Sequence, residues 1–315
     1  MLLAACTDPA APVRGEPWTS GPSMPGRRLE AAVAAHGTRL VVAGGFSTSA
    51  MEGLAITREV ITLDTFTGAW TSLPELPVAW THGGLAAVGP TLYLLGGLEG
   101  QAFVARGEAF ALDLGGDTWR SLPALPAGQE RGAAAVVVSP PHIFLLGGAA
   151  SSGALASVLD FNISTEAWSQ LPDLPTARSH AAAMRLDDGT LIVAGGLADG
   201  TGIPLGDVYE LPLGATAWQL REPMPTRRGG CAHGRVLGSL VCAGGEAGAA
   251  TLRTVEIYDA SSNTWTAMPD MPIERAGAPG AVIGQRLYIP GGSGTFAFEP
   301  TDSVLVFSLL DALAR

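Results

Sequence analysis

The chain has 315 residues, of which 47% are hydrophobic and 15% are charged, so it can bury a large core and is not intrinsically disordered. Its 29 acidic residues outnumber its 18 basic residues, all of them arginine, and leave a net charge of −11. An acidic chain without clustered cations is not expected to bind nucleic acid, and no apolar run approaches the roughly 18 residues that span a bilayer.

Residues 1–15 are predicted to be the remnant of a targeting signal followed by a tether, and not part of the folded domain. The segment Leu3-Ala4-Ala5-Cys6 resembles the lipobox of bacterial lipoproteins, in which the cysteine is lipidated after signal cleavage. Only five residues precede Cys6, whereas a working signal needs a charged start and a longer apolar stretch. We therefore predict a lipid anchor at Cys6 and a place in the bacterial cell envelope, periplasmic or lipid-anchored, if the true start lies upstream. Otherwise we expect a cytoplasmic protein.

From residue 16 onward, two markers repeat in step about every 50 residues. A Gly-Gly pair follows an apolar run six times, and a tryptophan opens a proline-terminated segment six times. The pairs are Gly44-Gly45, Gly96-Gly97, Gly147-Gly148, Gly195-Gly196, Gly244-Gly245 and Gly291-Gly292. The tryptophans are Trp18, Trp70, Trp119, Trp168, Trp218 and Trp265. Two markers that keep step over six periods predict six copies of one structural unit.

Each copy holds four short strand candidates, which the fifth copy shows most clearly. GGCAHGRVL and LVCAGG predict one hairpin, closed near Gly238-Ser239, and VEIYD and NTWTAMP predict a second. Asp259 can close the second turn through its own side chain, and an Asp or Asn stands six residues before the tryptophan in most copies. The fourth copy has Pro212 there, so its turn should differ.

Two of the three cysteines lie on the two arms of the first hairpin of this copy. Cys242 is expected to face His233, which makes Cys231 its diagonal neighbour. Diagonal pairs lie about 7–8 Å apart, which is too far for an unstrained disulfide. We therefore expect two buried thiols.

Four strands in a period near 50 residues resemble one blade of a kelch-repeat β-propeller. The resemblance rests on an arginine-led inner strand (residues 131–138, for example), the Gly-Gly pair, and a Trp six residues after an Asp. It covers nearly the whole chain and implies an all-β, six-bladed kelch-type β-propeller over residues 16–310, followed by a C-terminal tail of residues 311–315. The chain enters at Trp18 in a fourth strand and leaves through a third strand at Ser303–Leu309. We therefore predict that the N-terminal strand joins the last blade and closes the ring.

Strand direction places the polar residues of the inner strands at one mouth of the channel. Equivalent positions carry Arg28, Trp80, Arg131, Arg178, Arg228 and Arg275, next to the extra Arg227. Glu30, His82 and His180 stand two residues further along. Guanidinium groups can grip carboxylates, Trp80 could stack on a sugar, and the carboxyl and imidazoles could transfer protons.

A structural role competes with this interpretation. An arginine repeated in five of six copies is also what a blade needs for its own stability, and it would pair with Glu59, Glu108, Asp207 or Glu256 between blades. The residues that break the repeat are therefore the better candidates for a site.

Two functional hypotheses remain open. The first is a monomeric, non-catalytic kelch protein that binds a protein or glycan ligand, anionic or polar, at the Arg-rich mouth. The second is an enzyme. The chain is distantly similar to bacterial kelch proteins that include N-acetylneuraminate epimerase, a periplasmic mutarotase for sialic acid. This resemblance implies an isomerase acting on an acidic sugar. Opening the ring of such a sugar needs an acid and a base, which Glu30, His82 or His180 could supply. It also needs an arginine for the carboxylate, which Arg28, Arg178 or Arg227 could supply.

No cofactor and no metal is expected. The sequence holds no His-x-x-x-His or Cys-x-x-Cys pair, and His82, His180 and His233 come from three different blades.

Overall fold

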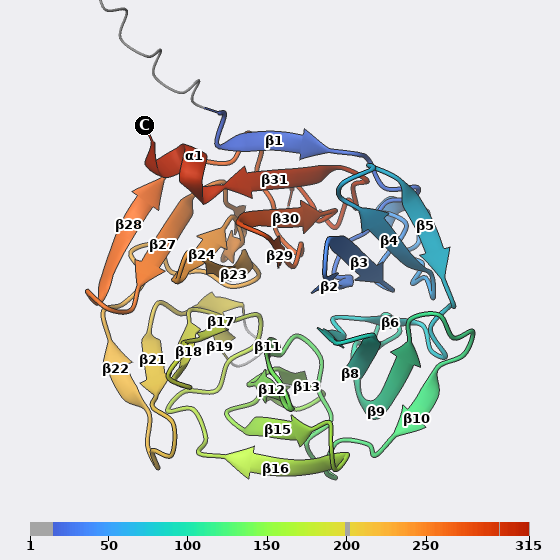
Figure 1. Ribbon diagram of the computed structural model, residues 1–315, viewed down its shortest axis with the longest axis horizontal. Coiled ribbons are helices and arrows are strands. Elements are labelled where there is room, and N and C mark those ends of the chain that lie inside the picture. The colour runs from blue at the N-terminus through green and yellow to red at the C-terminus, as the bar shows by residue number, and fades with distance from the viewer. Residues whose placement is uncertain (1–14, 199–201, 296, 315) are drawn as a thin grey trace, which may run out of the picture.

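Each repeat folds into two hairpins that share one antiparallel sheet, as the alternation of apolar runs and turn residues predicts. The computed structural model describes residues 15–198, 202–295 and 297–314. Within these residues, six sheets are arranged as blades around a central channel (Figure 1). The predicted six-bladed all-β propeller is confirmed.

In every blade the strands follow one another from the channel outward to the rim. Blade 1 consists of β2 (Ala32–His36), β3 (Arg39–Ala43), β4 (Val60–Asp64) and β5 (Trp70–Leu73). Blade 2 consists of β6 (Trp80–Thr81) with β7 (Gly84–Val88), β8 (Thr91–Glu99), β9 (Val104–Asp113) and β10 (Arg120–Leu122). Blade 3 consists of β11 (Ala135–Ser139), β12 (His142–Leu146), β15 (Val158–Asn162) and β16 (Ala167–Leu171). Blade 4 consists of β17 (Ala182–Arg185), β18 (Leu191–Ala194), β21 (Val208–Leu211) and β22 (Gln219–Arg221). Blade 5 consists of β23 (Ala232–Val236), β24 (Ser239–Ala243), β27 (Val255–Asp259) and β28 (Thr264–Met268). Blade 6 consists of β29 (Ala281–Ile283), β30 (Arg286–Pro290), β31 (Val304–Ser308) and β1 (Trp18–Gly21).

Smaller elements decorate the loops and the C-terminal end. Three small hairpins, whose strands have two residues each, extend the loops after the second strands of blades 3 to 5. In blade 1, η1 (Ala50–Glu52) lies in the corresponding loop. The hairpins are β13 (Ala149–Ala150) with β14 (Gly153–Ala154), β19 (Leu197–Ala198) with β20 (Ile203–Pro204), and β25 (Glu246–Ala247) with β26 (Ala250–Thr251). The segment predicted as a tail begins inside a short helix, α1 (Leu309–Leu313). No helix in the described part of the chain is long and apolar enough to cross a membrane.

The two ends of the propeller meet in blade 6. Strand β1 pairs antiparallel with β31, with Trp18 opposite Phe307 and Gly21 opposite Val304 (Figure 1). The N-terminal strand is thus the outermost strand of the last blade, as predicted. This pairing leaves no gap in the ring for another sheet edge to enter.

The repeated tryptophans join neighbouring blades along the outer rim. Each indole Nε1 donates a hydrogen bond of 2.8–3.2 Å to a backbone carbonyl of the preceding blade, four residues after that blade's own tryptophan. The acceptors are Pro22, Pro74, Pro123, Pro172, Glu222 and Pro269. The Trp and Leu-Pro motifs therefore repeat together because each blade supplies the acceptor for the next.

The core is divided between the blades. Six clusters of buried aliphatic and aromatic residues occur in the described part of the chain, and each lies at a junction of two adjacent blades, including the junction of blades 6 and 1. The ring is consequently a cycle of similar interfaces, and it holds the channel mouth rigid.

The cysteine prediction was wrong. Cys242 does face His233, as expected, but Cys231 and Cys242 form a disulfide with their Cα atoms 5.7 Å apart. The diagonal spacing used in the prediction applies to a regular ladder, and here β23 begins only at Ala232. Cys231 therefore precedes the ladder, and the backbone brings it closer than a regular strand would.

Candidate functional site

A ring of six equivalent residues surrounds the channel mouth where the chain enters the inner strands. All six have left-handed backbone conformations, with φ between 51° and 63°. The members of this inner ring are Glu30, His82, Ala133, His180, Gly230 and Gly277. Such conformations are unfavourable for residues other than glycine, and four of the six are not glycine.

Backbone hydrogen bonds explain why this conformation is kept. In five of the six ring residues, the backbone amide donates a hydrogen bond of 2.8–2.9 Å to the carbonyl of the ring residue in the preceding blade. The series begins with the amide of Glu30, which donates to Gly277, and ends with the amide of Gly230, which donates to His180. The inner ring therefore links adjacent blades around the axis. The backbone from which its side chains project is therefore held in place by the scaffold.

Three of these side chains meet at the mouth. The ligand atoms of Glu30, His82 and His180, which we call the mouth cluster, all lie within 4.8 Å of one another. Nε2 of His82 is 3.4 Å from Oε2 of Glu30, and the two imidazole rings are nearly perpendicular with centroids 5.2 Å apart. These three residues come from blades 1, 2 and 4, and they are the acid and base candidates that the sequence pattern indicates.

The remaining ring positions make room for this meeting. Ala133, Gly230 and Gly277 carry a methyl group or no side chain. A Cβ atom at Gly277 would lie 2.6 Å from Oε1 of Glu30, so the Glu30 carboxyl occupies space that only glycine leaves. Gly277 is therefore as necessary to the cluster as its polar members.

Hydroxyl groups fix the orientation of both imidazoles. Nδ1 of His82 is 2.8 Å from Oγ1 of Thr81, and Nδ1 of His180 is 3.0 Å from Oγ of Ser179. Both hydroxyl residues are buried. Because each Nδ1 is engaged by the preceding residue, the Nε2 atoms are the ring nitrogens that remain for chemistry inside the cluster.

Burial controls the charge of the cluster. Desolvation lowers the pKa of His82 to about 3 and that of His180 to about 4, in the second case against the attraction of Glu30. Desolvation also raises the pKa of Glu30, against the attraction of His180. Nearby, burial and the repulsion of Glu30 raise the pKa of Glu246 to about 7. At neutral pH both imidazoles are therefore uncharged, and both carboxyls are easier to protonate than an exposed glutamate.

An aromatic wall borders the cluster on one side. The ring of Phe103 lies edge-on to His82 with centroids 5.7 Å apart, and Phe46 contacts both Phe103 and Phe298 at 6.0 and 6.4 Å. These phenylalanines come from the loops between the second and third strands of blades 2, 1 and 6. Sequence reasoning missed them, although their loops face the predicted binding side. Phe103 and Phe298 lie in irregular loops, and Phe46 directly follows a Gly-Gly pair, where the other copies have no aromatic residue.

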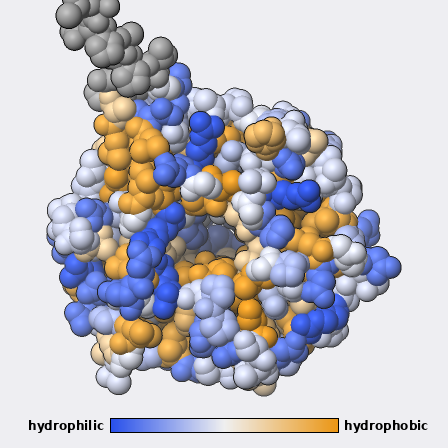
Figure 2. Space-filling model, in the orientation of Figure 1, coloured by the Kyte–Doolittle hydropathy of each residue, from blue (hydrophilic) through white to orange (hydrophobic). Residues whose placement is uncertain are grey.

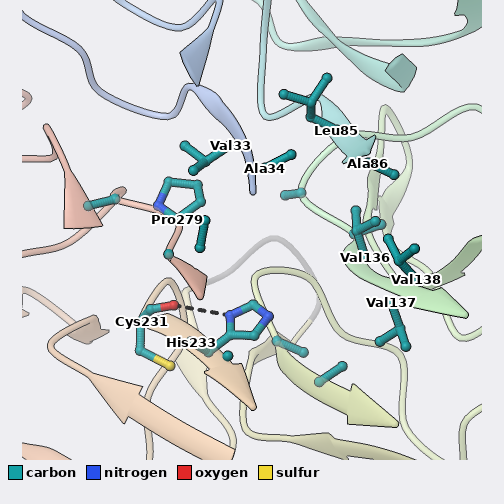
Figure 3. A pocket seen from close by; sticks show the side chains of 18 of the residues that line it. Val33, Ala34, Leu85, Ala86, Val136, Val137, Val138, Cys231, His233 and Pro279 are labelled. Atoms are coloured by element: carbon teal, nitrogen blue, oxygen red, sulfur yellow. Dashed lines mark hydrogen bonds between the residues drawn. The ribbon is translucent and has the colours of Figure 1, made fainter. Parts of the chain in front are cut away.

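Below the mouth, the channel is narrow and mostly apolar. A cavity of about 520 Å³ is lined by the inner strands, and a hollow is visible at the centre of the ring in Figure 2. Figure 3 shows Val33, Leu85 and Val136 on its walls, with His233 hydrogen bonded to the carbonyl of Cys231. The only strongly polar groups at the mouth end that the described residues place in this cavity are those of the mouth cluster.

The structure corrects the prediction that the repeated arginines bind a ligand. Arg28, Arg131, Arg178, Arg228 and Arg275 are each at most 4% exposed. The Arg178 guanidinium, for example, donates from Nη1 to the carbonyls of Gly195 and Asp207 at 2.8 and 3.2 Å. Arg131, Arg178 and Arg228 in this way tie the inner strand to the Gly-Gly pair of the same blade. Arg28 and Arg275 bond instead to Glu59 and Ser303. All five side chains are thus engaged inside their blades and do not reach a ligand in the channel.

The alternative structural role fits better, with one change. Arg28 pairs with Glu59 and Arg228 pairs with Glu256, as proposed, but each pair lies within one blade and not between blades. Trp80, at the equivalent position in blade 2, is 3% exposed and packs on Phe110 with centroids 5.9 Å apart. It therefore cannot stack on a sugar. Arg227 is exposed and lies across Gly206.

Comparison with known proteins supports the propeller fold. Residues 132–311 match the family described as the KLHDC2/KLHL20/DRC7 Kelch-repeats domain. The chain belongs to the kelch-repeat family. Among curated relatives of this kelch protein, Kelch-like protein terF of Aspergillus terreus is 33% identical over 279 residues, which are 84% of this chain and 61% of that protein. Kelch repeat and BTB domain-containing protein 8 of Danio rerio is 32% identical over 98 residues, which are 30% of this chain and 16% of that protein.

The kelch chain spans less than two thirds of the length of these curated relatives. Among solved structures, the one titled "Structure of YjhT" superposes with a TM-score of 0.78 at 16% identity, covering 92% of this chain and 97% of that chain. At this identity the likeness supports the propeller fold and not a shared activity.

Proposed function

We propose that this kelch propeller is a recognition module that binds a protein or glycan partner at the channel mouth. The observation that carries the proposal is the mouth cluster with its aromatic wall: three half-buried polar side chains held by the inner ring beside Phe103 and Phe298. Rigid scaffolds with variable loops on one face are common seats of binding, and aromatic side chains contribute strongly to recognition. The partner groups expected here are polar or anionic ones flanked by apolar surface.

The proposal is tested by screening the immobilised protein against a glycan array and a displayed peptide library. A ligand should bind the wild type and lose at least tenfold in affinity when Phe103→Asn and Phe298→Asn are combined; asparagine tolerates the positive φ of both positions. Phe66→Asn is the matched control, because Phe66 is 92% exposed in the turn between β4 and β5 on the opposite face. A ligand that binds the double variant with the same affinity as the wild type contradicts the proposal.

A second candidate function is a carbohydrate-active enzyme such as a sialic acid mutarotase. It is favoured by one observation, namely a carboxyl and two imidazoles within 4.8 Å whose pKa values burial shifts in opposite directions. Such pairs of shifted groups suit the acid and base of a ring-opening reaction. The arginines do not favour it, because Arg28 and Arg178 are buried and only Arg227 remains exposed among those considered for the sugar carboxylate.

Mutarotation measured by NMR decides on this second candidate. The wild type should accelerate the interconversion of sialic acid or uronic acid anomers, and Glu30→Gln should remove the acceleration. If the wild type leaves the rate at its uncatalysed value, the enzyme hypothesis is abandoned and the binding proposal is unaffected.

For location, we propose the bacterial cell envelope. Cys6 and the rest of the suggested lipid anchor lie outside the described residues, so this rests on the Cys231–Cys242 disulfide, because stable disulfides are typical of oxidising compartments. Fractionation of the native organism, with thiol labelling of the recovered protein, tests it. A cytoplasmic protein with both thiols free would contradict it.

A further inference from the structure

We propose that the mouth cluster is a binding site for a divalent transition-metal ion of the zinc type, held by Glu30, His82 and His180 with a further coordination position facing the channel mouth. The proposal concerns the cluster itself and does not depend on which partner the propeller recognises. Two imidazole nitrogens and one carboxylate oxygen are a donor set that zinc accepts in proteins, with a fourth position left for water or a ligand atom.

The spacing of the donors fits such an ion. With bonds of about 2.0–2.1 Å, the ligand atoms of a tetrahedral zinc site lie roughly 3.3 Å from one another. Nε2 of His82 and Oε2 of Glu30 already have this separation, at 3.4 Å. The full set lies within 4.8 Å, so a change of about 1.5 Å in the position of one side chain, which a change of rotamer supplies, completes the geometry.

The surroundings orient the donors as an outer shell of a metal site does. Imidazole ligands usually donate their second N–H to a nearby oxygen, which fixes the ring and directs the lone pair of the other nitrogen to the metal. Oγ of Ser179 and Oγ1 of Thr81 are at hydrogen-bonding distance from Nδ1 of His180 and His82. Thr81 donates its own hydrogen to the carbonyl of Leu98, so it accepts from His82, and Nε2 of His82 carries a lone pair.

This assignment makes the pair of His82 and Glu30 informative. A lone pair on Nε2 faces the carboxyl oxygen of Glu30 at 3.4 Å. Two acceptors at this distance repel each other unless a cation or a proton lies between them. A metal ion satisfies both acceptors and also His180, whereas a proton on Glu30 satisfies only the pair.

The inner ring also limits the number of protein ligands. Ala133, Gly230 and Gly277 hold its other positions and offer no donor side chain. Three protein ligands with an open position are typical of zinc sites that bind a further molecule, in contrast to structural sites closed by four. The wall formed by Phe103 next to His82 would border that open position.

The test is a metal titration of the full chain purified without a histidine tag and stripped with a chelator. Zinc competition against a chromogenic chelator should give one ion per chain, and cobalt should give the visible absorption of a low-coordinate site. His82→Gly and His180→Gly should each lower the zinc affinity by more than tenfold. Glycine is the ring residue of blades 5 and 6, so these variants keep the positive φ without strain.

Two further variants separate a metal site from general weakening of the fold. Ser179→Ala should lower the zinc affinity about tenfold, the lower end of the range for an outer-shell partner, with little change in melting temperature. His233→Gln removes a histidine from the same channel outside the cluster and should keep one ion per chain. Absence of zinc and cobalt binding at micromolar concentration, or binding that survives in the His82→Gly, His180→Gly double variant, overturns the proposal.

Discussion

Arg227 and Arg228 are adjacent in the sequence and have opposite environments. Arg228 is 1% exposed, donates to the carbonyls of Gly244 and Thr254, and forms a buried ion pair with Glu256. Removing one partner of a buried pair leaves an uncompensated charge, so Arg228→Met should lower the free energy of unfolding by about 3–5 kcal/mol. Arg227→Met should change it by less than about 0.5 kcal/mol, because Arg227 lies on the surface. Urea denaturation of the two variants measures the contrast, and equal effects would contradict the structural role assigned to the repeated arginine.

His233 gives the propeller a predictable response to acid. Burial in the channel lowers its pKa in the folded state, whereas the unfolded chain has a histidine pKa of about 6.5. Below about pH 6.5 the unfolded state therefore binds more protons than the folded state, and stability decreases as the pH falls. His233→Gln removes this contribution, so the variant should lose less melting temperature than the wild type between pH 7.5 and pH 5. Identical losses in the two proteins would show that His233 is not held neutral by the fold.

At this scale the sequence was informative where residues broke the repeat. Glu30, His82 and His180 were recognisable because other copies have Ala or Gly at their position, and the structure brings the three together. The repeated arginines misled, because a residue kept in most copies reports what every blade needs, which here is a buried donor for backbone carbonyls. Phe103 could not be found from the pattern, since its contact with His82 depends on the path of one irregular loop.

Among the structural elements, the six indole hydrogen bonds act as separate staples between blades. Trp119 of blade 2 donates to Pro74 at 3.0 Å, and Trp265 of blade 5 donates to Glu222 at 3.1 Å. Replacing either by phenylalanine keeps most of the ring contact and removes the hydrogen bond, which should cost about 1 kcal/mol. Because blades 2 and 5 share no interface, the two losses should add within about 0.5 kcal/mol in the double variant. Thermal and urea unfolding measure this, and strong non-additivity would show that the blades do not act as independent units.

Strand order and the tight turns could be predicted because they follow from local residues. Asp64 and Asp259 accept hydrogen bonds from backbone amides two residues on, as the turn chemistry requires. The small hairpins such as β13 with β14 have no comparable signal, since two residues of Ala or Gly do not specify a strand. The disulfide could not be predicted for a related reason. The distance between Cys231 and Cys242 depends on the residue at which strand pairing starts, which the spacing of the cysteines in the sequence does not define.

For the whole molecule, stability depends on the pairing of β1 with β31. This pairing covers the edge at Val304–Ser308, places Trp18 on Phe307 with ring centroids 4.8 Å apart, and supplies the staple from Trp18 to Pro269. A chain that lacks residues 1–21 loses all three contributions, and it also exposes an apolar strand edge that can pair with another molecule. The truncated protein should melt about 10 °C or more below the full chain and should associate, as judged by light scattering after size exclusion.

A circular permutant isolates the cause of that loss. In it, residues 15–21 follow the C-terminus through a flexible Gly-Ser linker, so that β1 can return antiparallel to β31 as the fourth strand follows the third in the other blades. Because the same contacts form with a different connection, the permutant should regain the association state of the full chain and most of its melting temperature. If the truncated chain is already monomeric and equally stable, ring closure by the N-terminal strand does not hold the propeller together, and the blade interfaces alone must account for its rigidity at the mouth.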